Sequence, residues 1–446
     1  MSHRNKTILM LVTLGLSALA CQTVTGVFSP SPQNNFPIPD STAVPTYAPD
    51  VTPPAPTPTS TLVPLNGQEQ QAIFDELWDV VNEEYLYEDF NGVDWDAAYI
   101  EFSQKITDGM SSEDFYFGAD ELIFNLGDEH SIYLNPQVVA WEDAEYDRGS
   151  DYVGIGIWIE MVPDRERAVV LLTFPGGPAD QAGIQAHDSI VSVEGVTYAD
   201  ADMFYLDRLD GVAGTPVTLT VQSPGEEPRQ LTVVRDRITG SLPIPHFVAT
   251  TPAGQKIGYL LVPTFSDGSI GDLVGEALDE LGAEGELDGL IIDQRMNSGG
   301  YDTVMADTLG YFASGLVGHF SNRSKDTPLR ITRRNVSGSA SLPLVVLVGE
   351  GTASFAEIFS GILQDLGRAT VIGETTLGNV EILWGYDFED GSRAWIAHDT
   401  FIPLNQPEAN WEKLGIIPSF EVSAPWDLYT FDTDPAILKA LEYFDL

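Results

Sequence analysis

Basic side chains are scarce in this chain. Its 446 residues include 21 lysines and arginines against 67 aspartates and glutamates, which gives a formal net charge of −46. A surface this acidic repels phosphate backbones and anionic lipid headgroups. We therefore expect neither nucleic acid binding nor docking through a basic membrane patch. The acidity is typical of a well-solvated surface and does not identify a substrate.

Cysteine is scarcer still. The one cysteine, Cys21, excludes a disulfide within the chain and a cysteine-based zinc cluster. The sequence also has no phosphate-binding loop or other cofactor fingerprint, so we expect a protein that works with neither cofactor nor metal. At roughly 100–200 residues per domain, the length predicts two or three folded units.

The N-terminal apolar run is too short for a comfortable membrane span. A positively charged start precedes the apolar residues 8–20, and small residues lead to Cys21. This pattern predicts a signal peptide over residues 1–20. The segment Ala18-Leu19-Ala20-Cys21 resembles a bacterial lipobox, in which the cysteine is lipidated, although Leu is more usual where Ala18 stands. The alternative is an ordinary secretory signal with an incidental cysteine, which would give a secreted protein.

A segment dense in proline, threonine and serine follows Cys21. It runs from Ser29 to Asn66 and has too little apolar periodicity to fold, so residues 21–66 are predicted to form a lipidated cysteine and an extended linker. The folded part is therefore expected outside the cytoplasm, tethered to a membrane of the cell envelope.

Hydrophobic periodicity divides the rest of the chain into four regions. Apolar residues at helical spacing over 67–89, and a second helical stretch after Ser111, predict a helical region over 67–149. Short strand-like runs between turn signals predict a mainly-β unit over 150–238. An α/β unit is expected over 245–425, and residues 426–446 form a C-terminal segment with a short helix.

Strands alternate with helices in the α/β unit. This alternation predicts a buried, mixed and largely parallel sheet flanked by helices. The expected strands are 257–262, 290–293, 344–349 and 369–373, and the expected helices are 268–282, 302–314 and 355–366.

The mainly-β unit resembles a PDZ domain. The similar motifs are the loop Gly154-Ile155-Gly156-Ile157 and residues 174–184 and 188–196. The loop's backbone N–H groups would hold a terminal carboxylate while the adjacent strand edge adds a peptide strand. A purely structural or regulatory clamp is the alternative. His187 stands where such domains usually carry glycine, and we expect it to be an exposed side chain in a surface turn.

Ser354 lies in a glycine-rich turn between a predicted strand and a predicted helix. At such a turn a hydroxyl is exposed and neighbouring N–H groups point at one spot, as acyl transfer requires. By itself the pattern is more typical of a helix N-cap. The surrounding motifs decide between these interpretations.

Several motifs around Ser354 resemble the core of the tail-specific, or C-terminal processing, serine peptidases. They lie in the same order at residues 257–260, 293–300, 351–358, 364–369, 371–375 and 415–418. The resemblance spans about residues 70–425 and implies a crotonase-like α/β peptidase core with an inserted PDZ domain. It also implies Ser354 as the nucleophile, the N–H groups of Phe355 and Gly300 as the oxyanion hole, and Glu357 as a supporting residue.

The base of these relatives is missing here. The family uses a lysine in a Thr-x-Gly-Lys-Gly motif with a supporting glutamine four residues later, and this chain has Asn379 and Leu383 at those positions. An asparagine amide does not accept a proton near pH 7, so another base must serve.

Two other segments resemble the tricorn-like branch of the same clan. Residues 126–131 resemble its histidine motif and residues 411–418 the segment that carries its glutamate. This resemblance implies that His130 takes the proton of Ser354. Glu412 would then orient the imidazole, directly or through a second hydroxyl such as that of Ser131. Three alternatives stay open: His130 is structural, Lys413 is a relocated base, or the scaffold is inactive.

These observations predict an extracytoplasmic serine endopeptidase. Its substrates would be polypeptides, unfolded or with free C-termini, that the PDZ domain receives or gates. The alternative is a catalytically inactive module that binds peptides or proteins. His246 and His398 are isolated in the sequence and are interpreted as structural. The sequence does not predict an oligomeric state.

Overall fold

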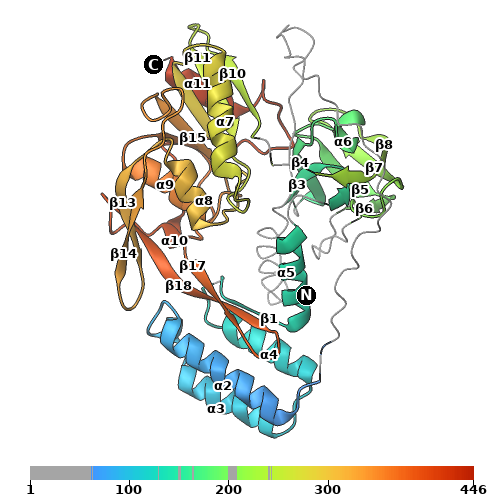
Figure 1. Cartoon of the computed structure of the whole chain (residues 1–446), viewed down its shortest axis with the longest axis vertical. Coiled ribbons are helices and arrows are strands. Elements are labelled where there is room, and N and C mark those ends of the chain that lie inside the picture. The colour runs from blue at the N-terminus through green and yellow to red at the C-terminus, as the bar shows by residue number, and fades with distance from the viewer. Residues whose placement is uncertain are drawn as a thin grey trace.

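The computed structural model describes residues 62, 64–128, 130–148, 152–162, 165–198, 208–239, 242 and 244–445. The predicted signal peptide, Cys21 and nearly all of the predicted linker lie outside the described residues. Figure 1 shows three parts: an α/β core, a β-rich unit beside it, and a group of helices at the other end of the molecule. Among the described residues, no helix is both long and apolar enough to cross a membrane.

The N-terminal helices are α2 (Gly67–Glu84), α3 (Trp95–Thr107) and α4 (Ser112–Phe124). Helix α2 begins with a capping box, in which Asn66 accepts from the backbone of Glu69 while the Glu69 carboxylate accepts from the backbone of Asn66. The apolar faces of the three helices share one buried cluster. Helices α2 and α4 confirm the predicted pattern, whereas α3 was not predicted. Helix α5 (Pro136–Arg148) lies between these helices and the β-rich unit (Figure 1).

The middle unit is built from short antiparallel strands. Its main sheet has the order β3-β4-β5-β7-β8, with β6 attached to β5, so β3 is an end strand. A separate pair joins β2 to β9. The bounds are β2 (Tyr152–Gly154), β3 (Ile157–Val162), β4 (Arg167–Thr173), α6 (Pro178–Gln181), β5 (Ser189–Val193), β6 (Val196–Thr197), β7 (Pro216–Gln222), β8 (Arg229–Val234) and β9 (Asp236–Ile238).

The α/β core contains a six-stranded sheet in the order β10-β11-β12-β15-β16-β19. All neighbours are parallel except β10 and β11. Strands β12 and β15 are buried along their whole length, as parallel strands covered on both faces are. The bounds are β10 (His246–Thr250), β11 (Lys256–Leu261), α7 (Ile270–Ala283), β12 (Gly289–Asp293), α8 (Asp302–Leu309), β15 (Leu344–Val348), α9 (Phe355–Asp365), β16 (Thr370–Gly373) and β19 (Phe420–Glu421).

These elements confirm the predicted mixed, largely parallel sheet. One prediction was too long: the helix expected over 302–314 ends at Leu309, where Gly310 forms the C-cap. Helices α10 (Trp411–Leu414) and α11 (Pro435–Phe444) follow later in the chain, and α11 confirms the predicted C-terminal helix.

A second sheet, which was not predicted, joins the core to the N-terminal helices. Its order is β1-β18-β13-β14, with β17 paired to β18. The long strand β18 pairs with β1 near its start and with β13 near its end, and Figure 1 shows the β17–β18 ribbon reaching from the core to the helices. The bounds are β1 (Ile132–Leu134), β13 (Gly315–Ser321), β14 (Asp326–Ile331), β17 (Ile382–Asp387) and β18 (Arg393–Pro403).

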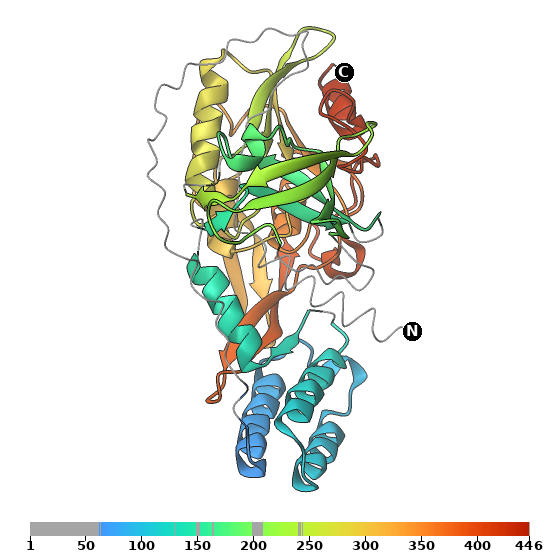
Figure 2. The same cartoon turned by 90° about the vertical axis from the view of Figure 1, so that its right-hand side faces the viewer.

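The prediction for His187 was wrong, because this side chain is 2% exposed. Its ring stacks on Trp426 with a centroid distance of 4.2 Å, and its Nδ1 lies 2.7 Å from the Trp426 carbonyl oxygen. The Trp426 indole N–H in turn donates to the carbonyl of Val170 in β4. The C-terminal segment therefore fastens the β-rich unit to the core, which this unit covers on one side (Figure 2). This interface uses residues too distant in sequence to be recognised by their spacing.

The buried His187 predicts a pH-dependent stability. Burial lowers the pKa of His187 to about 4, below the value of about 6.5 expected in the unfolded chain. Between these values the unfolded state binds a proton that the folded state excludes. The free energy of unfolding should therefore fall, by about 3 kcal/mol, as the pH drops from 7 to 4.

Urea unfolding of the wild type and of His187→Asn across this pH range measures the effect. Asparagine tolerates the positive φ of 73° at this position. The variant should be less stable at pH 7 and should lack this part of the pH dependence. An identical pH dependence in both proteins would contradict the assignment.

Candidate active site

Ser354 occupies a strained turn between β15 and α9. Its backbone has φ 52° and ψ −127°, a combination that few residues other than glycine adopt. Such a sharp strand-to-helix turn exposes the nucleophile of the α/β-hydrolases. The turn lies at the carboxyl end of a parallel strand and at the N-terminus of a helix, where backbone dipoles favour negative charge.

The turn over residues 297–300 packs directly against Ser354. A Cβ atom on Gly299 would lie 2.7 Å from Ser354 Cβ and 3.1 Å from the backbone nitrogen of Phe355, and Gly299 has a φ of 103°. The carbonyl of Asn297 also accepts a hydrogen bond from the Ala353 N–H at 3.0 Å. Only glycine permits this close approach of the backbone to the serine.

The predicted oxyanion donors flank this contact. Gly300 follows Gly299 in the same turn, and Phe355 is the first residue of α9. Among the described residues, the N–H groups of Gly300 and Phe355 donate no hydrogen bond to another backbone group. The arrangement leaves two backbone donors beside Ser354.

Glu357 is a buried carboxylate at the start of α9. It accepts from the backbone of Ser354 at 3.1 Å, from Gly378 and Asn379 at 2.8 Å each, and from the Thr376 hydroxyl. Burial raises the pKa of Glu357, and these hydrogen bonds oppose the rise. Glu357 therefore ties the serine turn to the loop that begins at Thr376.

The same loop holds a second carboxylate. The backbone N–H groups of Val380 and Glu381 donate to Glu412 Oε2, at 2.7 and 3.1 Å. The other oxygen, Oε1, lies 2.7 Å from Nε2 of His130. Four consecutive N–H groups, from residue 378 to residue 381, thus connect the glutamate beside Ser354 to the glutamate beside His130.

His130 and Glu412 form a largely buried pair, with side chains 6% and 15% exposed. Burial lowers the pKa of His130, but the hydrogen bond and charge of Glu412, with the charges of Glu381 and Asp128, outweigh it, so the pKa is raised overall. The second ring nitrogen, Nδ1, is buried and has no hydrogen-bond partner among the described residues. Ser354 and His130 form no hydrogen bond with each other in this structure.

Ser131 does not lie between His130 and Glu412. Its hydroxyl donates to Asp128 and accepts from the Ala397 N–H. Of the two predicted alternatives, the structure therefore has the direct imidazole–glutamate contact. Lys413 is exposed on α10. Asn379 contributes its backbone N–H to the site.

Sequence reasoning missed Glu381 and Tyr87. The Glu381 side chain is 4% exposed and accepts a hydrogen bond from the Tyr87 hydroxyl. Burial and the neighbouring Glu412 raise the pKa of Glu381. No local pattern marks these two residues, since Tyr87 follows α2 and Glu381 precedes β17, and only the fold brings these distant parts of the chain together.

The remaining predicted groups lie away from Ser354. The loop Gly154–Ile157 precedes and enters the end strand β3, and its Ile155 and Gly156 carbonyls accept from Ala179 and Phe174. His246 and His398 are not isolated in the structure. His246 contacts Glu280 at 3.0 Å, and His398 contacts both Glu84 and Asp399.

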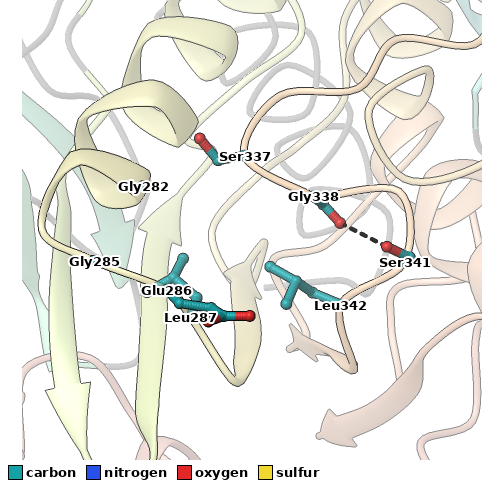
Figure 3. A pocket seen from close by; sticks show the side chains of 8 residues that line it. All are labelled: Gly282, Gly285, Glu286, Leu287, Ser337, Gly338, Ser341 and Leu342. Atoms are coloured by element: carbon teal, nitrogen blue, oxygen red, sulfur yellow. Dashed lines mark hydrogen bonds between the residues drawn. The ribbon is translucent and has the colours of Figure 1, made fainter.

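A hollow of about 320 Å³ opens at the opposite end of the core sheet (Figure 3). It lies next to the segments that precede β12 and β15, whereas Ser354 follows the carboxyl end of β15. Figure 3 shows that the Ser341 hydroxyl, which lines the hollow, donates to the Gly338 carbonyl. The hollow is therefore separate from the candidate site. Its lining residues are Gly282, Gly285, Glu286, Leu287, Ser337, Gly338, Ser341 and Leu342.

Comparisons with known proteins agree with this fold. Residues 256–422 match the model of peptidase family S41, and residues 67–117 match that of the tricorn protease C1 domain. A carboxyl-terminal-processing protease of a Synechocystis species is 29% identical over 384 residues, covering 85% of this chain and 87% of the relative. Carboxy-terminal processing protease CtpB of Bacillus subtilis is 27% identical over 345 residues, covering 74% and 67%.

A solved structure is similar over most of the chain as well. The photosystem II D1 C-terminal processing protease superposes with a TM-score of 0.55 at 26% identity, covering 79% of this chain and 92% of that protein. The similarity therefore extends beyond the 256–422 segment that matches the family model.

The contacts of Glu357 predict a marked loss of stability in Glu357→Gln. The amide NH₂ would face backbone N–H groups that need an acceptor, so the free energy of unfolding should fall by about 2–4 kcal/mol. Urea unfolding measures the loss. The exposed Glu389→Gln is the control and should change stability by less than about 0.5 kcal/mol. Equal stability of Glu357→Gln and the wild type would refute the role given to this carboxylate.

Proposed function

We propose that the chain cleaves peptide bonds through an acyl-enzyme on Ser354. Its residues 256–422 match the model of peptidase family S41, and its relatives are named carboxyl-terminal-processing proteases. His130 is the general base, and Glu412 is the residue that positions it. The observation that carries this proposal is the loop over 378–381, whose backbone N–H groups connect the serine turn to the His130–Glu412 pair.

In the first step Ser354 Oγ attacks the carbonyl carbon of the peptide bond. With Nε2 held by Glu412, the nitrogen left to accept the serine proton is Nδ1 of His130. This transfer requires Oγ and Nδ1 to come within about 3 Å, and such contacts are often longer before substrate binds. The N–H groups of Gly300 and Phe355 would stabilise the oxyanion of the tetrahedral intermediate.

In the second step the C–N bond breaks and the imidazolium of His130 donates its proton to the leaving amine. Water then attacks the acyl-enzyme, with His130 again taking a proton, and Ser354 is released. Glu412 stabilises the charged imidazole in both halves of the cycle. Its effect is electrostatic and orientational, since the proton itself stays on His130.

Two observations argue against an inactive scaffold. A strained backbone at Ser354 costs about 1–3 kcal/mol, and such strain is concentrated at functional sites. Burying the His130–Glu412 pair also carries a desolvation penalty, and a module that only binds peptides does not require such a pair. Lys413 is a poorer base than His130, because it is exposed and His130 is held in a buried pair that the loop connects to the serine turn.

We further propose that residues 150–238 form a PDZ domain that receives or gates polypeptide ends, and that residues 245–425 form a crotonase-like core. The end strand β3 supports the peptide site, since it follows the Gly154–Ile157 loop and its outer edge pairs with no other strand in the part of the chain that the structure describes. Such an edge can add a peptide strand. Substrates would then be polypeptides that are unfolded or have free C-termini. The signal peptide and the lipid anchor at Cys21 rest on the sequence alone and stay predictions.

A fluorophosphonate probe tests the catalytic assignment. The wild type should be labelled, Ser354→Ala should not, and His130→Ala should label at least about 100-fold more slowly, the size of a general-base contribution. Glu412→Gln should lose less than His130→Ala, because it removes orientation and charge stabilisation and leaves the proton acceptor in place. Ser341→Ala and His246→Ala are the matched controls and should label like the wild type.

Two results would contradict the assignment. If His130→Ala labels as fast as the wild type while Ser354→Ala is unlabelled, another group is the base, and Lys413→Ala becomes the next variant. If the folded wild type is not labelled at all, the chain is an inactive scaffold.

The proposed peptide site predicts a preference for free C-termini. With the full-length Ser354→Ala chain, which prevents turnover, an apolar peptide with a free carboxylate should bind at least about 10-fold more tightly than its amide, or about 1.4 kcal/mol. Fluorescence anisotropy of labelled peptides measures both affinities. Equal binding of the two forms would show that the middle unit is a structural clamp.

A further inference from the structure

Three side chains at the candidate site converge on one point. His130, Glu381 and Glu412 each offer a nitrogen or oxygen donor, and these donors all lie within 4.8 Å of one another. The proposed peptidase cycle uses His130 and Glu412 but has no role for Glu381. This third side chain is buried, and its Oε2 has no hydrogen-bond partner among the described residues.

Both glutamates are oriented from outside the cluster. The N–H groups of Val380 and Glu381 hold Oε2 of Glu412, which turns Oε1 to the imidazole. The Tyr87 hydroxyl holds Oε1 of Glu381, which leaves Oε2 free. Hydrogen bonds that fix one atom of each carboxylate and leave the other available are typical of the surroundings of metal ligands.

The charges also favour a cation. Among the described residues, neither Glu381 nor Glu412 forms an ion pair with a lysine or arginine, and both carboxylates are largely buried. A protonated His130 balances at most one of the two carboxylates, and burying the remaining negative charge is costly. One divalent ion between the two carboxylates would remove this cost.

We propose that His130, Glu381 and Glu412 bind one Zn²⁺ ion, and that the bound ion holds the peptidase inactive. Three nitrogen or oxygen ligands with water in a fourth position are typical of zinc, whereas Ca²⁺ and Mg²⁺ prefer sets made of oxygen ligands. A neutral imidazole has one lone pair on its ring nitrogens. When zinc takes this lone pair, the imidazole has none left for the proton of Ser354.

No metal was expected from the sequence, because its single cysteine excludes a cysteine cluster and it carries no cofactor fingerprint. Here the ligands come from the segment before β1, the residue before β17 and helix α10, and only the fold brings them together. Binding of zinc does not depend on the proposed function. Inhibition by zinc does rest on it.

Zinc binding is measured on the full-length Ser354→Ala chain by competition with a chromophoric chelator. We expect one Zn²⁺ per chain, and binding at least about 10-fold weaker when Glu381→Gln is added. His130→Gln, added in place of Glu381→Gln, gives a second reading of the same loss if the first variant folds poorly. Glu280→Gln is the control, since it removes the carboxylate of the exposed His246–Glu280 pair, and it should leave zinc binding and peptidase activity unchanged.

The activity arm uses the active wild-type chain and a denatured protein substrate. Zn²⁺ should inhibit at the concentrations that fill the site, EDTA should restore activity, and Ca²⁺ at equal concentration should not inhibit. Absence of zinc binding to Ser354→Ala, or equal binding after Glu381→Gln, would overturn the site. Zinc that binds without inhibiting would overturn only its inhibitory role. Zinc binding to a chain that never labels with fluorophosphonate would leave this site standing and reject the proposed peptidase.

Discussion

Four consecutive backbone N–H groups, from Gly378 to Glu381, are the contacts on which the whole candidate site depends. The first two hold Glu357, whose carboxylate also accepts from the backbone of Ser354, and the last two hold Glu412, which pairs with His130. Because these donors belong to one short stretch of backbone, the serine turn and the histidine pair cannot move independently. Hydrogen bonds to buried carboxylates are among the stronger ones in proteins, so the loop acts as a rigid connection.

Strand β18 explains how His130 reaches this loop from so far away in the chain. Its residue Ala397 pairs with Leu383 of β17, and the Ala397 N–H donates to the Ser131 hydroxyl. Ala397 therefore holds Leu383, just after the loop over 378–381, on one side and Ser131, the neighbour of His130, on the other. The second sheet thus does more than join the helices to the core, since its register sets the position of the imidazole. The β-rich unit is held separately, by the stack of His187 on Trp426.

The sequence predicted the features that depend on local pattern. Short apolar runs such as 290–293 and 344–348, rich in β-branched residues, favour strands of a covered sheet. The strand-to-helix turn at Ser354 is indicated by its glycine-rich neighbours. His130 and Glu412 were suggested by resemblance to a known family, because no spacing connects residues this far apart. The same limit explains the missed role of Glu381, the second sheet and the buried His187. From the sequence, His187 resembles a surface residue in a turn. Only the fold shows that Trp426 of the C-terminal segment covers it.

The proposed mechanism requires a contact between Ser354 and His130 when substrate is bound. A crystal structure of the chain with a phosphonate bound to Ser354 Oγ shows this contact in the geometry of the tetrahedral intermediate. The account predicts His130 Nδ1 within about 3 Å of an oxygen on the adduct, with Nε2 still on Glu412 and the adduct's other oxygen facing the N–H groups of Gly300 and Phe355. An imidazole that stays out of reach of the adduct, with another side chain in its place, would contradict it.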